Sequence, residues 1–173
     1  MQITRKHVGT LTMLGALVLS PLAMAQAAAD TAPAVSKQDT AFVAKASAAG
    51  MTEVQASKLA DSRAQSAAVK SFAARMVTDH TKAGDELSAV AQKDGFAPST
   101  SPMPAQQKAL AKLETLNGAA FDKAYSSMML KDHIEAVALF KKESTSGKND
   151  DLKSFAAQTL PTLDEHLAMA KKL

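Results

Sequence analysis

The chain of 173 residues contains no cysteine, no tryptophan and only one tyrosine. Without cysteine it can form no disulfide, carries out no thiol chemistry and offers no attachment point for a lipid anchor. Aromatic residues make up 4% of the chain, and its lysines and arginines form no dense block. Because basic patches and stacking aromatics are what usually hold nucleic acids, we expect no nucleic-acid partner. Glycine-rich phosphate loops are also missing.

Residues 1–25 have the pattern of a secretory signal peptide. Arg5 and Lys6 precede an apolar stretch over residues 8–19, Pro21 ends that stretch, and a small-x-small site allows cleavage after Ala25. Residues 27–29 offer a second site. A retained membrane anchor is the alternative, but the stretch is shorter than the ~20 residues of a spanning helix. We therefore expect cleavage, no transmembrane span afterwards, and a location in the periplasm, with outer-membrane association as a further option.

Removal of that segment changes the charge balance. The full chain has 20 lysines and arginines against 17 acidic residues, a formal charge of +3. Cleavage would remove Arg5 and Lys6, leaving 18 basic residues against the same 17 and a charge near +1. The basic character of the whole sequence therefore says little about what the mature protein binds.

Residues 26–35 are rich in alanine and predict a loose leader, and residues 36–173 predict a single all-α domain. No segment alternates with period two, whereas apolar residues recur at steps of three and four. Prolines at 98, 102 and 104 mark the main break, and Pro161 should kink the last helix. The helices are expected over residues 36–63, 66–94, 105–116, 119–144 and 150–173.

The sequence contains an internal repeat. The pentapeptide KSFAA occurs at residues 70–74 and 153–157, and in each copy an acidic residue and then a histidine follow. Ala-Phe at 41–42 matches Ala-Phe at 120–121, and eleven residues after each phenylalanine stand Glu53 and Asp132. The repeat predicts two related helical hairpins. Chance similarity between alanine-rich helices is the simpler alternative.

His80, His133 and His166 are the only histidines after residue 25, and each falls on a different long helix, at or beside its apolar stripe. The remaining long helix carries Glu53 on its stripe. If the short helix lies in a full-length crossover, helical rise places His80 level with His133, and Glu53 near His166. We therefore expect two polar pairs, Glu53–His166 and His80–His133.

Two long segments carry a resemblance to a known family. Residues 42–87, "FVAKASAAGMTEVQASKLADSRAQSAAVKSFAARMVTDHTKAGDEL", resemble the opening of the bacterial domain-of-unknown-function family 4142, and "GAAFDKAYSSMMLKDHIEAVALF" and "LKSFAAQTLPTLDEHL" resemble its second half. The resemblance covers residues 38–172. It implies a secreted protein, of a kind often labelled an outer-membrane or periplasmic protein, with a ferritin-like four-helix bundle. It implies no particular biochemical activity.

The ligand pattern of ferritin-like di-iron sites does not survive in this sequence. Such sites use Glu-x-x-His on two helices, which places both ligands on one face. Here Val77, Leu130 and Leu163 stand three residues before the histidines. We therefore reject oxygen activation or ferroxidase chemistry. A binding protein is favoured over an enzyme.

Three function classes stay open. The first is a non-enzymatic exported binding or stress-associated protein of unknown ligand, in which the histidines form a buried polar layer. The second is a metal-binding protein using Glu53, His80, His133 and His166, for zinc, copper, iron or nickel. The third is a chaperone-like or envelope-interaction module with an envelope protein as partner, which would need an exposed apolar groove.

Overall fold

The computed structural model describes residues 35–173, which form five helices and, within this range, no strand. The expected signal peptide and residues 26–34 of the expected leader lie outside these residues. The all-α prediction is confirmed, and the observed helices lie close to the expected ones. Their bounds are Lys37–Arg63 (α1), Ala67–Asp94 (α2), Pro104–Glu114 (α3), Gly118–Ser146 (α4) and Asp150–Ala170 (α5).

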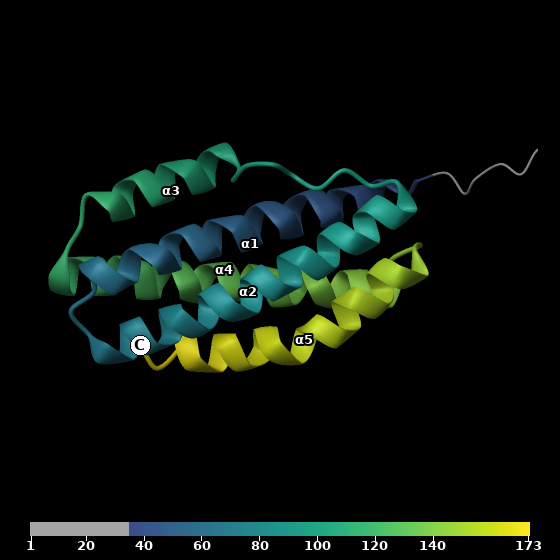
Figure 1. Ribbon diagram of the computed structural model, residues 1–173. Coiled ribbons are helices and arrows are strands. Elements are labelled where there is room, and N and C mark those ends of the chain that lie inside the picture. The colour runs from purple at the N-terminus through teal and green to yellow at the C-terminus, as the bar shows by residue number, and fades with distance from the viewer. Residues whose placement is uncertain (1–34) are drawn as a thin grey trace, which may run out of the picture. The chain divides into compact units, whose positions relative to one another are not determined.

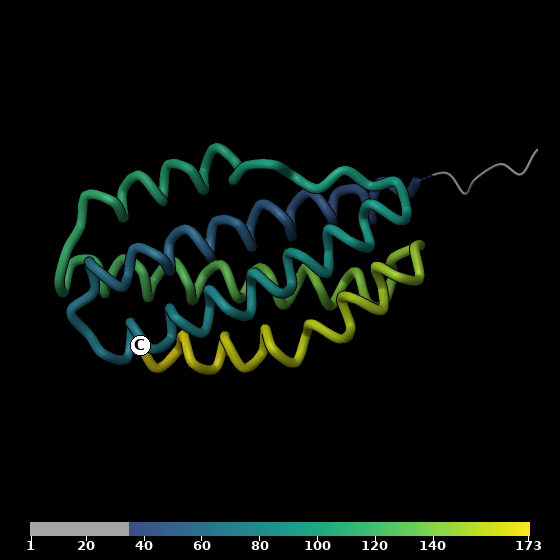
Figure 2. Tube along the Cα trace, in the orientation of Figure 1, coloured from purple at the N-terminus to yellow at the C-terminus, as the bar shows by residue number. Residues whose placement is uncertain are grey.

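The four long helices form a ferritin-like bundle of two hairpins, α1–α2 and α4–α5 (Figure 1). Each long helix borders two others: α1 contacts α2 and α4, and α5 contacts α4 and α2. The chain between α2 and α4 runs back along the whole bundle and contains α3, which packs on α1 (Figure 2). The turns of the two hairpins therefore lie at opposite ends, as the crossover prediction required.

Helix ends follow local chemistry. The Ser36 hydroxyl accepts hydrogen bonds from the backbone N–H groups of Gln38 and Asp39, which satisfies donors at the start of α1. Helix α2 ends at Asp94 and is capped by Gly95, whose φ of 75° lies in the left-handed region that favours glycine. Pro161 does not end α5, which is continuous through it, and Figure 2 shows the axis of this helix bending about midway.

Each hairpin turn is held by a carboxylate from the other hairpin. Asp122, near the start of α4, accepts hydrogen bonds from the backbone N–H groups of Gln65 and Ser66 between α1 and α2. Asp39, near the start of α1, accepts them from Lys148 and Asn149 between α4 and α5. Because unpaired N–H groups are costly, these bonds fix both ends of the bundle.

A polar layer divides the apolar core into two clusters. One cluster centres on Phe72, Phe121 and Tyr125 and includes buried leucines of α3. The other centres on Phe42, Phe140 and Phe155. Buried histidines and a glutamate lie between them, on the stripes that the sequence predicted to face inward.

Candidate metal centre

Four buried polar side chains meet in the middle of the bundle, one from each long helix: Glu53 on α1, His80 on α2, His133 on α4 and His166 on α5. His80 is 8% exposed, and the other three are 2% exposed or less. Each side chain points inward because it occupies a position of its helix's apolar stripe, where the 3.6-residue period would otherwise place a core residue.

The three imidazoles form a compact group. Ring centroids are 5.6 Å apart for His80 and His133, 5.3 Å for His80 and His166, and 5.4 Å for His133 and His166. One nitrogen from each ring lies within 4.8 Å of the other two. Phe72 packs edge-on beneath two of the rings, with centroids 6.3 Å from both His133 and His166.

One nitrogen of each ring contacts a neighbouring oxygen. Nδ1 of His133 donates to the backbone carbonyl of Met129 at 2.8 Å, and Nε2 of His166 lies 2.8 Å from Oδ2 of Asp79. Nδ1 of His80 lies 3.0 Å from Oε2 of Glu53, whose Oε1 is 3.6 Å from Nδ1 of His133. These contacts set the orientation of all three rings.

The other nitrogen of each ring is buried and unpaired. Within residues 35–173, no hydrogen-bond partner reaches Nε2 of His80, Nε2 of His133 or Nδ1 of His166. The Met129 carbonyl and the Asp79 carboxylate can only accept, so His133 and His166 keep their protons on the bonded nitrogens when neutral. Their unpaired nitrogens then carry free lone pairs, which are the atoms that bind a metal ion.

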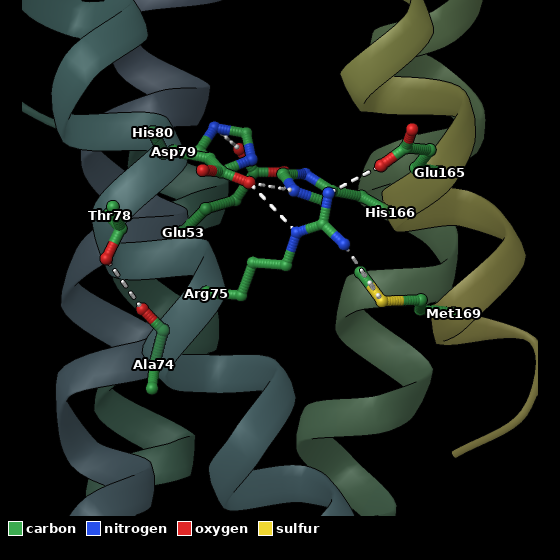
Figure 3. A network of polar contacts seen from close by, with 9 residues as sticks. All are labelled: Glu53, Ala74, Arg75, Thr78, Asp79, His80, Glu165, His166 and Met169. Atoms are coloured by element: carbon green, nitrogen blue, oxygen red, sulfur yellow. Dashed lines mark hydrogen bonds and ion pairs between the residues drawn. The ribbon is translucent and has the colours of Figure 1, made fainter.

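Asp79 links His166 to the surface. Its carboxylate also accepts from Nε of Arg75 at 3.2 Å, and Arg75 in turn pairs with Glu165 on α5 (Figure 3). Burial alone would raise the pKa of Asp79, but the hydrogen bonds from His166 and Arg75 outweigh it and lower the pKa. Asp79 is therefore a fixed anion that holds one edge of the His166 ring.

Burial keeps the histidines uncharged. Burial, together with a smaller effect of the neighbouring imidazoles, lowers the pKa of His80 to about 3 and that of His133 to about 4. The pKa of His166 is lowered by burial, against the opposing effect of Asp79. Burial also raises the pKa of Glu53 well above its usual value. Since a metal binds only neutral imidazole, the three rings are in their binding form at neutral pH.

The structure brings together all four residues that the sequence singled out, but their pairing differs. The expected Glu53–His166 pair is wrong: Glu53 contacts His80 and His133, and His166 bonds Asp79. His80 and His133 do lie at one level. Helical rise predicts the level of each residue along the bundle axis. The contacts between neighbours depend on the side-chain rotamers and on the order of the helices around the axis, and residue spacing gives neither.

Sequence reasoning missed the roles of Asp79 and Arg75. Asp79 directly precedes His80, so the two side chains point about 100° apart on the helix. That angle is what lets it reach sideways from α2 to α5, while His80 points into the core. The i,i+4 spacing of Arg75 and Asp79 was the available signal, because such pairs stabilise a helix face.

The residues fit a transition metal. Three imidazoles are a ligand set for zinc, copper, iron and nickel, and ligating histidines usually have their second nitrogen bonded to a carboxylate or carbonyl, as here. Around a tetrahedral ion the nitrogens would be about 3.4 Å apart. The nitrogens lie within 4.8 Å of one another, so the rings would move closer together around a bound ion.

The family model for the domain of unknown function DUF4142 matches residues 24–173. The chain belongs to this family. No curated protein shows significant similarity to it. Among solved structures, the chain is similar to the crystal structure of a DUF305 fragment from Deinococcus radiodurans, with 17% identity and a TM-score of 0.70 over 81% of this chain and 97% of that one. At this identity the likeness shows a shared helical fold.

Membership in the family agrees with the resemblance of the sequence and leaves the activity undefined. For the described part of this family member, none of the helices has both the length and the apolar character needed to cross a lipid bilayer.

Proposed function

We propose that this protein is an exported, non-enzymatic binding protein whose ligand is a single transition-metal ion held by His80, His133 and His166. The observation that carries this proposal is the set of three buried imidazole nitrogens without partners among residues 35–173. A buried polar atom left unpaired costs about 1–3 kcal/mol. One metal ion would satisfy all three atoms at once.

The surrounding contacts support this assignment over a purely structural polar layer. In a layer of that kind, the histidines would bond one another or nearby backbone groups and leave little unpaired. Here each ring presents one nitrogen to a neighbouring oxygen, and the other has no hydrogen-bond partner in the described part of the chain. Glu53 and Asp79 then act as positioning residues, and they stabilise a bound cation by their charge.

Export is part of the proposal. It is supported by the signal-peptide pattern of residues 1–25. A periplasmic protein meets metals that are not buffered by the cytosol, and a buried site of neutral imidazoles would take them up without any thiol. Of the divalent first-row ions, Cu²⁺ should bind most tightly, since affinities generally follow the Irving–Williams order.

The chaperone-like alternative finds less support. A client-binding face needs contiguous exposed apolar surface. The large hydrophobic residues that are exposed among residues 35–173 belong to four different segments, ahead of α1, ahead of α3, within α4 and after α5: Val35, Met103, Ile134 and Leu173.

The test is to load purified mature protein with Cu²⁺, Zn²⁺, Ni²⁺ or Fe²⁺ and measure bound metal together with the melting temperature. We expect a single ion per chain and a higher melting temperature, because a ligand that binds only the folded state stabilises it. The double variant His80→Ala/His133→Ala should lose both effects. Absence of bound metal and of any thermal shift in the wild-type protein would overturn the proposal.

A further inference from the structure

A cavity of about 340 Å³ leads from the surface of the bundle to the polar layer. Glu53 and His80, which are 2% and 8% exposed, line its inner end. Exposed residues of three other segments also line it: Lys45 in α1, Met103 just ahead of α3 and Glu135 in α4. The cavity therefore opens to solvent between α1, α4 and the start of α3, and it ends at the candidate metal centre.

His80 is the histidine by which the cavity reaches this centre. It lines the cavity, whereas His133 and His166 do not, and those two rings are only 0% and 1% exposed. Nε2 of His80 has no hydrogen-bond partner among residues 35–173. Phe72 packs against the rings of His133 and His166, and Asp79 binds His166 from α2. An ion that arrives through the cavity would therefore meet His80 before the other two rings.

The charges along the cavity favour cations. Its lining contains three carboxylates, of Glu53, Asp132 and Glu135, and one ammonium group, of Lys45. Glu135 is 3.7 Å from Lys131, but the ion-pair partners of Glu53 among residues 35–173 are two imidazoles, which burial keeps neutral. A cleft with low-dielectric walls and one sign of charge raises the association rate of its counter-ion by about 10–10³-fold.

Two glycines leave open space near the inner end. Gly50 precedes Glu53 by three residues and Gly84 follows His80 by four, so each lies about one helical turn from a polar residue of the layer. Both glycines line the cavity, and a Cβ added at either one would meet no atom of the described residues within 4 Å. A larger side chain at these positions would therefore extend into the cavity.

We propose that this cavity is the entry route of the metal ion, in which Asp132 and Glu53 attract a divalent cation and His80 is the first of the three imidazoles to bind it. This inference rests on the proposed function. The cavity has about ten times the ~30 Å³ that one water occupies in the liquid, so the ion enters with its water and exchanges it for carboxylate and imidazole. Asp132 is a positioning residue for uptake and is not a ligand of the bound ion.

The experiment measures how fast the mature protein takes up and releases copper. Metal-free protein is mixed with Cu²⁺ in a stopped-flow instrument, and the quenching of Tyr125, the only tyrosine of the chain, reports binding. Mixing the loaded protein with excess EDTA gives the release rate. The ratio of the two rates gives the dissociation constant, which equilibrium competition with a chromophoric chelator checks.

Two kinds of variant test the route. Gly84→Leu and Gly50→Leu place a side chain in the cavity, and Ala68→Leu, at an exposed position of α2 outside the lining, is their control. Asp132→Asn removes a charge without changing the size of the side chain. Asp61→Asn, an exposed carboxylate of α1 outside the lining, is the control for net charge.

We expect each glycine variant to slow uptake and release alike, by about tenfold or more, which is about 1.4 kcal/mol in the barrier. The dissociation constant should stay the same, because a narrowed route raises the barrier in both directions. Asp132→Asn should slow uptake severalfold and weaken its dependence on salt, since steering by charge is screened by ions. Both control variants should behave like the wild type.

Normal copper binding with wild-type rates in both glycine variants would overturn this inference and leave the proposed function standing. A weaker affinity of these variants without slower uptake and release would also overturn it, because the leucines would then act on the site and not on the route. Asp132→Asn keeps the packing intact and decides independently: wild-type uptake in this variant at every salt concentration would remove the steering role. Failure of the wild type to bind copper would overturn both proposals.

Discussion

His166 and Asp79 lie 2.8 Å apart across the contact between α5 and α2, and Arg75 binds the same carboxylate from the solvent side. Within residues 35–173, this contact connects the buried imidazole group to the surface ion pair of Arg75 and Glu165. It holds Nε2 of the His166 ring and leaves Nδ1 without a hydrogen-bond partner among the described residues. The metal affinity of the centre should therefore depend on a residue that does not itself bind the ion.

Replacing Asp79 by asparagine tests this dependence. The neutral amide loses the charge-assisted bond to the ring, and loss of such a partner typically lowers metal affinity about 10–100-fold. We expect this loss in a competition titration, with only a small change in the melting temperature of the metal-free protein. Asp85→Asn, an exposed carboxylate on the same helix, is the control. Unchanged affinity in Asp79→Asn would show that the ring is held by packing alone.

Glu53→Gln should weaken metal binding in the same way. The amide keeps the size of the side chain that lies 3.0 Å from His80, but it carries no negative charge to offset a bound cation. Equilibrium dialysis against Zn²⁺ measures the effect, and the exposed Glu86→Gln provides the comparison. Zinc binding as tight as in the wild type would contradict the role given to Glu53.

The two copies of KSFAA should differ in what their phenylalanines do. Phe72 packs against the rings of His133 and His166, whereas Phe155 packs against Phe42 and Phe140 in the other cluster. Alanine at either position should cost about 3–5 kcal/mol in urea unfolding, because both side chains are buried. Phe72→Ala should lower metal affinity markedly more than Phe155→Ala does. An equal effect on metal affinity would count against Phe72 as the support of the imidazoles.

Stability should also depend on pH through Glu143. Burial raises the pKa of this carboxyl from 4.5 to about 7, and its Oε1 has no hydrogen-bond partner among the described residues. Between these two values the folded protein holds a proton that the unfolded chain has released. The contribution of Glu143 to stability is therefore full below about pH 4.5 and is lost as the pH rises to about 7.

Melting temperatures of the wild type and Glu143→Gln at pH 5 and pH 8 isolate this effect. The glutamine has no proton to lose, so the variant should gain stability relative to the wild type at the higher pH. Glu114→Gln, which removes an exposed carboxyl, should show no such relative gain. The same difference between wild type and Glu143→Gln at both values would contradict the raised pKa.

Gly50→Ala and Gly84→Ala should each stabilise the protein by about 0.5–1 kcal/mol, because the added methyl group improves helix propensity and meets open space. Urea unfolding of the metal-free protein measures this directly. Destabilisation by either substitution would mean that the space at that glycine is filled.

The helices and their inward faces could be predicted because they follow from local rules. The three- and four-residue recurrence of Val69, Phe72, Met76 and His80 indicates one buried stripe, and Gly95 indicates where that helix stops. The rise per residue and the crossover also predicted that each long helix carries one polar residue near a common level of the bundle. These are properties of single helices or of one connection.

The contacts around the centre could not be predicted in the same way. Whether Glu53 touches His80 or His166 depends on rotamers and on the rotation of each helix about its axis, and the spacing between residues specifies neither. The space beside Gly50 and Gly84 could not be predicted either, because in the sequence these glycines only lower the helix propensity of otherwise regular helices. Only packing shows that the space in front of them is empty.

The exchange of carboxylates between the hairpins makes each half depend on the other. Asp122 completes the turn at Gln65 and Ser66, and Asp39 completes the turn at Lys148 and Asn149. Cleavage of the chain between α2 and α4 would give two fragments. Each fragment would lack the carboxylate that binds the backbone N–H groups of its own hairpin turn. Such fragments should fold only by reassembling with one another, so the protein is a single cooperative unit despite its repeated sequence.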